Sequence, residues 1–333
     1  SDVKLTLDAD LCKTAYEALG GKKGAVVVYN YKTGAILCEV STPSFDPGAP
    51  PADLDTDETG KYEGVYLNNV LSSTYTPGSV FKVVTTAAAI ENIPDLDSRT
   101  FTCDGSVVIN GNQINCLATH GQIDFKTALS HSCNVVFGEL AVELGEEKMT
   151  AMANQMGFNT SFEFDGIHTA KSVYQVKGAS DDALAWSGIG QYTDLANPMH
   201  MAILMGAVAN GGTPVLPHFV DSITTSFGLV THMGYPQEGE RMLSASTADR
   251  LKGYLRNNVS SYYGDNLFPS GMEVCAKTGT AEVGKGKAPT GWMIGFSANS
   301  STPYAFAVAV EEGRSGIGSA GSVASAVLDR LAA

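Results

Sequence analysis

Three short motifs in this sequence contain groups that can carry out acyl transfer. The first pairs a serine with a lysine, the second a serine with an asparagine, and the third a lysine with a threonine. They are S-x-x-K at Ser79 and Lys82, S-x-N at Ser132 and Asn134, and K-T-G beginning at Lys277. A serine hydroxyl is a weak nucleophile until a nearby base takes its proton, and a lysine can serve as that base. These residue types therefore predict attack of a serine oxygen on a carbonyl carbon.

Each motif occurs a second time, so no single match decides where a site lies. The second matches are Ser1/Lys4, Ser297/Asn299 and Lys32-Thr33-Gly34. Residues three apart on a strand point to opposite faces, which argues against Ser1/Lys4 because residues 3–7 alternate like a strand. Lys32-Thr33-Gly34 is typical of a turn between strands. The segment at Lys277 is flanked by strand-like sequence, so its periodicity alone does not distinguish a turn from a site.

The sequence after Pro77-Gly78 predicts a helix over 79–90 that begins at a serine. Residues i and i+3 of a helix share a face, so the side chains of Ser79 and Lys82 can meet there. Free backbone N–H groups and the positive end of the helix dipole lie at the same place. That environment favours a neutral lysine and stabilises a developing oxyanion, and Lys82 is the only base that the local sequence supplies.

Strand-like segments gather at both ends of the chain, and helical segments lie between them. The expected strands are 3–7, 25–29, 35–39, 272–283, 291–298 and 303–311, with a hairpin over 101–116 around Asn110-Gly111. The other expected helices are 8–19, 124–145, 147–156, 197–209, 245–258 and 320–331. The stretch 41–64 is rich in Pro, Asp and Gly and predicts a long loop. This order predicts a mixed sheet covered by helices.

The motifs, taken in the order 79, 132, 277, resemble the transpeptidase domain of the penicillin-binding proteins. The resemblance covers nearly the whole chain and includes further segments: 33–37, 44–47, 75–82, 120–121, 132–134, 188–191, 209–212, 277–280 and Trp292. The absence of Pro after Lys82 and the Ser44-Phe-Asp-Pro stretch are more similar to the monofunctional class B members. Ala276 and Tyr192 depart from the residues that are common in the family, and neither removes a reacting group.

The resemblance implies an α/β mixed (α+β) fold of the serine β-lactamase type. Its largely antiparallel sheet is formed by the N- and C-terminal strands and covered by helices on both faces, and an all-helical region is inserted. Residues 1–333 are then one transpeptidase domain, and we expect an anchor and a pedestal domain to precede it in the intact protein. We also expect that protein to work on the extracytoplasmic face of the bacterial cell membrane, with this fragment soluble by itself.

The resemblance also implies a role for each motif residue in a peptidoglycan D,D-transpeptidase. Ser79 attacks the penultimate D-alanine of a stem peptide, Lys82 is its general base, and Ser132 relays the proton to the leaving amine. The backbone N–H groups of Ser79 and Thr280 form the oxyanion hole. Asn134 binds the substrate's amide carbonyl, and the terminal carboxylate is held by the K-T-G strand, which is Lys277, Thr278, Gly279 and Thr280.

The implied ligands are stem peptides that end in D-Ala-D-Ala and the β-lactams that mimic them, without any cofactor. A membrane glycan polymerase and the cell-wall assembly are the expected partners of the intact protein. Attack by water instead of an amine would give D,D-carboxypeptidase activity. A β-lactamase or a β-lactam sensor shares this chemistry, but no glutamate can be assigned as the base for deacylation. A non-catalytic scaffold is disfavoured by the intact set of reacting residues.

Dinucleotide binding is an alternative function. It is indicated by a G-x-G-x-x-G motif, Gly316-Ile-Gly-Ser-Ala-Gly321, which lies between an expected strand and an expected helix. Only residues 322–333 follow, so the unit lacks its second strand and an acidic residue for the ribose. A close-packed glycine loop is the simpler interpretation. The histidines have no G-x-S-x-G nucleophile to serve, and His120 is expected to have a structural hydrogen-bonding role.

Composition excludes several further classes of protein. The chain has 333 residues with a net charge of −14, which disfavours nucleic acid as a partner. No C-x-x-C pair and no H-E-x-x-H occur, so the sequence predicts no metal site. Cys103 and Cys116 are close enough in sequence to form a disulfide, and the sequence leaves open whether they do.

Overall fold

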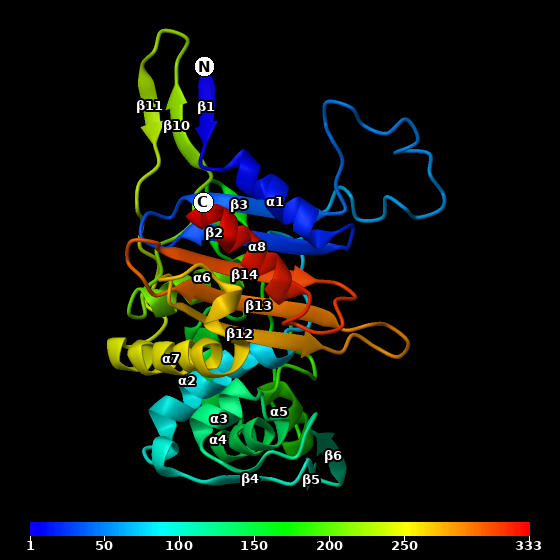
Figure 1. The fold of residues 1–333 in the computed structure, drawn as a ribbon, viewed down its shortest axis with the longest axis vertical. Coiled ribbons are helices and arrows are strands. Elements are labelled where there is room, and N and C mark those ends of the chain that lie inside the picture. The colour runs from blue at the N-terminus through cyan, green and yellow to red at the C-terminus, as the bar shows by residue number, and fades with distance from the viewer.

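The computed structural model describes residues 1–333 and is built around one antiparallel sheet of five strands (Figure 1). In spatial order the strands are β12 (Val274–Ala281), β13 (Thr290–Ser297), β14 (Tyr304–Val310), β2 (Gly24–Asn30) and β3 (Ile36–Thr42). The pairing of β14 with β2 joins the two ends of the chain, with Phe306 opposite Val28. The predicted sheet of N- and C-terminal strands is therefore confirmed.

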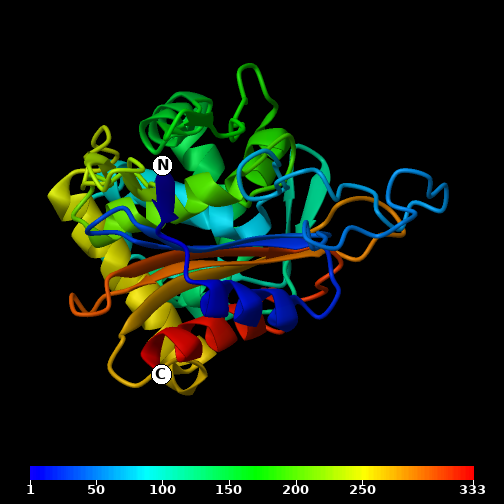
Figure 2. The same cartoon turned by 90° about the horizontal axis from the view of Figure 1, so that it is seen from above.

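Helices cover both faces of this sheet, as the view along it shows (Figure 2). Helices α1 (Ala9–Leu19) and α8 (Ala320–Ala332) pack together on one face, and α6 (Pro198–Ala209) packs on the other. Because neither face meets water, β2 and β14 are almost continuously buried and their sequences are apolar runs without alternation.

The region inserted between β3 and β12 holds most of the remaining elements. Its helices are α2 (Lys82–Asn92), α3 (Phe125–Ser130), α4 (Asn134–Gln155), α5 (Asp181–Gly188) and α7 (Ala245–Asn258), besides α6. It also contains three two-stranded sheets, which are β4 (Phe101–Cys103) with β7 (Gly121–Ile123), β5 (Ser106–Ile109) with β6 (Asn112–Asn115), and β8 (Glu163–Phe164) with β9 (Ile167–His168). The insert expected to be all-helical therefore also contains short strands, and the hairpin expected around Asn110-Gly111 is β5–β6.

The helix expected over 124–145 is wrong as a single element. Its first part, α3, begins after Asp124, whose carboxylate accepts a hydrogen bond of 2.8 Å from the Thr127 N–H, and ends at Ser130. Ser132 then adopts a left-handed conformation with φ of 56°, and α4 starts at Asn134. Periodicity did not reveal the break because the buried positions keep a helical spacing on both sides of it.

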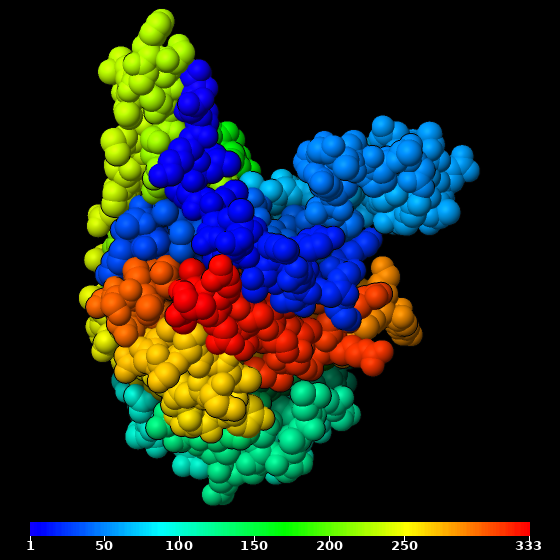
Figure 3. All heavy atoms as spheres, turned by 45° about the horizontal axis from the view of Figure 1, so that its top comes forward, coloured from blue at the N-terminus to red at the C-terminus, as the bar shows by residue number.

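Two segments project from the body of the molecule (Figure 3). One is a ribbon in which β1 (Asp2–Leu5) pairs with β10 (Val220–Thr224) and β10 pairs with β11 (Val230–Met233). The sequence predicted only its first strand. The other is the long loop between β3 and Gly78, which confirms the loop expected over 41–64. None of the helices combines the length and the apolar character that crossing a bilayer requires.

A close contact between two glycines holds the turn that leads into α2. The N–H of Gly78 donates a hydrogen bond of 3.0 Å to the carbonyl of Gly190, and both residues have positive φ, 56° and 84°. A Cβ on Gly190 would overlap the carbonyl group of Gly78. The start of α2 is therefore positioned by a packing contact that only glycine allows.

We expect Gly190→Ala to destabilise the protein by clearly more than Gly178→Ala. Both glycines have left-handed φ, which costs an alanine about 1–2 kcal/mol, but a Cβ on Gly178 meets nothing within 4 Å. The clash with Gly78 adds roughly 1–3 kcal/mol at Gly190. Chemical denaturation of both variants measures the difference. Equal losses of unfolding free energy would contradict the packing role of this contact.

Candidate active site

Ser79 lies where a short 3₁₀ turn, η1 (Gly78–Phe81), runs into α2. Strand β12 passes directly against this turn: a Cβ on Gly279 would lie 3.0 Å from both the Pro77 carbonyl oxygen and the Val80 nitrogen. A side chain at that position would push the strand away from η1. The glycine of the K-T-G motif therefore allows the strand to approach the serine closely.

Lys82 is completely buried, and its amino group meets polar atoms of its own turn and of the S-x-N segment. Nζ lies 3.1 Å from Ser79 Oγ, 3.0 Å from Ser132 Oγ and 2.7 Å from Asn134 Oδ1. It also contacts the Ser132 carbonyl oxygen at 2.9 Å. The structure thus brings the S-x-x-K and S-x-N motifs together at one nitrogen atom.

Burial changes the protonation of this lysine. Removal from water disfavours the charged form and lowers the pKa of Lys82 to about 7, while Cys133 and Cys116 act in the opposite direction. A large share of the Lys82 side chains is then neutral at physiological pH. A neutral amine 3.1 Å from Ser79 Oγ is able to accept the proton of that hydroxyl.

Ser132 connects the two buried lysines. Its hydroxyl oxygen lies 3.0 Å from Lys82 Nζ and 3.1 Å from Lys277 Nζ. Its left-handed backbone lies in the break between α3 and α4. The S-x-N motif is therefore placed by this break, whereas a continuous helix would have a different course here.

Strand β12 carries the K-T-G residues along the outer edge of the sheet. Lys277 is fully buried, and its Nζ donates to the Thr278 carbonyl at 2.8 Å as well as meeting Ser132. Burial first, and the charge of Lys82 second, hold the pKa of Lys277 well below its usual range. Because β12 pairs only with β13, no other strand covers its outer edge. Arg256 donates to the Val274 carbonyl on that edge, and Asn258 donates to the Ala276 carbonyl. An extended peptide would therefore add to the strand beyond them, at the K-T-G residues.

Residues of two neighbouring segments form hydrogen bonds to β12 that the sequence did not predict. The Tyr263 hydroxyl accepts hydrogen bonds from the Thr278 N–H at 3.1 Å and from the Thr278 hydroxyl at 3.2 Å. Thr280 Oγ1 accepts one from the Gly316 N–H at 3.2 Å. No motif marks Tyr263, because its contact depends on how the segment after α7 folds back onto β12.

The second matches of each motif lie away from this cluster and have structural roles. Lys4 lies on β1, and the Lys32-Thr33-Gly34 segment forms the turn between β2 and β3. Ser297 Oγ donates to the Met272 carbonyl at 2.7 Å in the interior. A Cβ on Gly316 would meet the Trp292 carbonyl oxygen, so the glycine-rich stretch there is a close-packed loop, in agreement with the simpler interpretation.

The residues expected to act together are therefore assembled in space, and their arrangement suits acyl transfer. Ser79 is the nucleophile that the geometry offers, with a buried amine beside it and a second hydroxyl between two lysines. Thr278, Gly279 and Thr280 follow on the adjacent edge strand β12. The partners of the Lys82 amino group are hydroxyl, carbonyl and amide oxygens, and none is a carboxylate. Burial therefore determines the pKa of Lys82.

The model of the penicillin binding protein transpeptidase domain family matches residues 24–331 of the chain. The chain belongs to this family. The peptidoglycan D,D-transpeptidase PbpA of Mycolicibacterium smegmatis is 29% identical over 99% of the chain and 71% of its own length. The family identification confirms the resemblance predicted from the three motifs.

Solved structures of the same kind superimpose on nearly the whole chain. The D,D-transpeptidase domain of a peptidoglycan glycosyltransferase from Eggerthella lenta has a TM-score of 0.89 and 29% identity, covering 99% of this chain and 82% of that one. Penicillin-binding protein A from M. tuberculosis, as an imipenem acyl-enzyme complex, has a TM-score of 0.88 and 26% identity over 99% and 79%. The transpeptidase fold expected from the sequence is thus confirmed.

The acylation rate of this penicillin-binding protein domain should follow the protonation of Lys82. Below its pKa of about 7 the charged amine cannot accept a proton, so the rate constant for acylation by a penicillin should rise about tenfold per pH unit and level off above it. Lys82→Arg, whose side chain stays charged, should react ~10²–10⁴-fold more slowly. A rate that rises only near the ordinary lysine pKa of about 10.4 would contradict this role.

Tyr263→Phe should slow acylation by about fivefold or more, because it removes both hydrogen bonds to Thr278 and each contributes about 1 kcal/mol. Tyr262 provides the matched control: its exposed ring contacts His131 and makes no hydrogen bond to the strand. Tyr262→Phe should therefore leave the rate unchanged. Stopped-flow measurements with a chromogenic cephalosporin compare the two, and equal effects would show that Tyr263 does not support the strand.

Proposed function

We propose that this domain is a serine-type peptidoglycan D,D-transpeptidase that cross-links stem peptides through an acyl-enzyme on Ser79. The observation that carries the proposal is the buried amine of Lys82, which lies within 3.1 Å of both Ser79 Oγ and Ser132 Oγ. The family and its named D,D-transpeptidase relatives support the same reaction. The reaction has two halves that use the same groups.

In the first half, Ser79 Oγ attacks the carbonyl carbon of the penultimate D-alanine while Lys82 takes the hydroxyl proton. The tetrahedral intermediate places its oxyanion at the backbone N–H groups of Ser79 and Thr280, where each donor contributes roughly 3–4 kcal/mol. Ser132 then passes a proton to the nitrogen of the terminal D-alanine, and the C–N bond breaks. The products are the acyl-enzyme and free D-alanine.

The terminal carboxylate of the donor would bind Lys277, Thr278 and Thr280 as the peptide lines up along the outer edge of β12. Lys277 has a lowered pKa in the free domain, but an incoming carboxylate favours its charged form. Binding of the substrate then supplies the counter-charge that the buried site lacks. Asn134 contributes its amide to the carbonyl of the donor, and its own Nδ2 donates to the Asn115 carbonyl at 3.0 Å.

In the second half, the amine of another stem peptide attacks the acyl carbon and loses its proton to Lys82 by way of Ser132. The ester bond to Ser79 breaks, and the new amide is the cross-link. Water in place of the amine would release a shortened peptide as a D,D-carboxypeptidase. A β-lactam enters the first half as a mimic of the donor and stays attached to Ser79.

We further propose that residues 1–333 act as one catalytic domain on the extracytoplasmic face of the bacterial membrane. Peptidoglycan is cross-linked outside that membrane, so both stem peptides meet the domain there. A membrane glycan polymerase within the cell-wall assembly is the proposed partner, because it would supply the strands that carry the stem peptides. The net charge of −14 gives no basis for a nucleic acid partner.

Incubation with penicillin should add the mass of one drug molecule to the wild-type chain and none to Ser79→Ala, measured by intact-mass spectrometry. Ser1→Ala is the matched control because Ser1 and Lys4 form the other S-x-x-K pair, and it should be labelled like the wild type. An unlabelled wild type or an equally labelled Ser79→Ala would contradict the assignment. Loss of the label within about seconds would identify a β-lactamase instead.

A further inference from the structure

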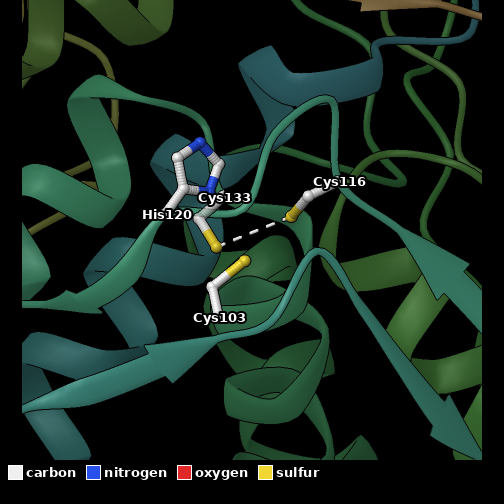
Figure 4. Close-up of side chains that lie close together, drawn as sticks. All are labelled: Cys103, Cys116, His120 and Cys133. Carbon is white, nitrogen blue, oxygen red and sulfur yellow. Dashed lines mark hydrogen bonds between the residues drawn. The ribbon is translucent and has the colours of Figure 1, made fainter.

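Three cysteines and one histidine of the inserted region lie close together (Figure 4), and one of them, Cys133, is the middle residue of the S-x-N motif. One ligand atom from each of Cys103, Cys116, His120 and Cys133 lies within 4.8 Å of the others. All the cysteines are free thiols, and the Sγ atoms of Cys116 and Cys133 are 3.6 Å apart. The sequence reading predicted no metal site because the four residues do not form a close-spaced motif.

We propose that Cys103, Cys116, His120 and Cys133 form a structural site for one zinc ion. Three thiolates and an imidazole are a common donor set of closed, tetrahedral zinc sites. With Zn–S bonds of about 2.3 Å, two sulfurs of a tetrahedron are about 3.8 Å apart, close to the 3.6 Å between Cys116 and Cys133. Small side-chain movements would therefore complete the site.

The four residues come from elements that already hold them in place. Cys103 ends β4 and lies opposite Gly121 of β7, so the two short strands bring Cys103 beside His120. The N–H of Cys116 donates to the Gly105 carbonyl at 2.9 Å, and Cys133 is the residue before the first turn of α4. The backbone therefore prearranges the donor atoms around a common centre.

The histidine provides an independent sign of a missing ligand. The Nδ1 atom of His120 is buried and makes no hydrogen bond, so the expected hydrogen-bonding role of this residue is not supported at that atom. An unpaired buried imidazole nitrogen costs free energy unless a partner satisfies it. A zinc ion among the sulfurs would be such a partner.

The burial of the donors fits a closed site. Cys103 and Cys133 are fully buried, and Cys116 and His120 are partly buried. The Val135 N–H donates to Cys116 Sγ at 3.3 Å, a contact that helps to stabilise a thiolate. On binding, each of the three thiols gives its proton to solvent, and the Zn²⁺ and three thiolates leave the centre with one negative charge.

The site would fix the geometry of the S-x-N motif, because Cys133 lies between Ser132 and Asn134. The start of α4 has no side-chain cap, and Ser132 is in the left-handed region with φ of 56°. The same metal would be bound by Cys103 at the end of β4 and by His120 before β7. A bond from it to Cys133 would therefore fix the positions of Ser132 and Asn134. This effect on acylation rests on the proposed function, whereas zinc binding itself does not.

Metal analysis of the full chain tests the proposal. The protein is purified with reduced thiols, loaded with zinc sulfate, dialysed and analysed by plasma mass spectrometry. Wild type and Cys275→Ser, which removes a buried cysteine far from the cluster in sequence, should retain about one zinc ion per chain. Cys103→Ser and His120→Ala should retain almost none. No zinc in the wild type, or equal zinc in all four proteins, would overturn the proposal.

Cobalt gives a second readout that does not depend on whether a variant folds. Titration of the zinc-free wild type with Co²⁺ should produce the ligand-field and sulfur charge-transfer bands of a tetrahedral thiolate site. Alkylation of the denatured, unreduced protein should modify all six cysteines. A spectrum without thiolate bands, or a disulfide between Cys116 and Cys133 that persists in reducing buffer, would overturn the metal site.

Penicillin labelling of Ser79 keeps the two proposals separate. Zinc removal with a chelator should slow acylation and lower the melting temperature of the wild type, and added zinc should restore both. Normal labelling of a protein that binds no zinc would overturn the metal site and leave the proposed function intact. Zinc binding without any labelling would do the reverse.

Discussion

The structure depends on two lysine side chains that are buried side by side. Lys82 and Lys277 both lie out of contact with water, and both contact the hydroxyl of Ser132. Removal from water disfavours the charged form of each amine and lowers both pKa values, and the charge of Lys82 lowers the pKa of Lys277 further. The base that the serine needs is therefore created by the packing of the domain.

That packing places three distant segments at the same point. The start of α2 is held by the contact of Gly78 with Gly190, the S-x-N turn by the break between α3 and α4, and β12 by its pairing with β13. A shift of any one of them would change the distances around Lys82 and admit water beside it. The stability of the fold and the reactivity of the site are thus linked through the same contacts.

The position of the S-x-N motif also depends on packing within the inserted region. Asn134 donates to the Asn115 carbonyl, and Cys133 lies beside Cys116, so the last residue of β6 and the residue after it contact the motif. The short strands β4, β5, β6 and β7 would be too small to fold alone. Strands β4 and β6 pack against α4 and so support the turn at Ser132.

The sequence by itself determined the family, the order of the motifs and the strands of the central sheet. Those features depend on local sequence: apolar runs such as Ala25–Tyr29 are typical of buried strands, and Ser79 and Lys82 meet within one helical turn. Only the tertiary structure decided the break at Ser132, the contact of Tyr263 with Thr278, and the gathering of the cysteines with His120. These depend on residues far apart in the chain, whose distances are set by sheet pairing and core packing, and no local periodicity records them.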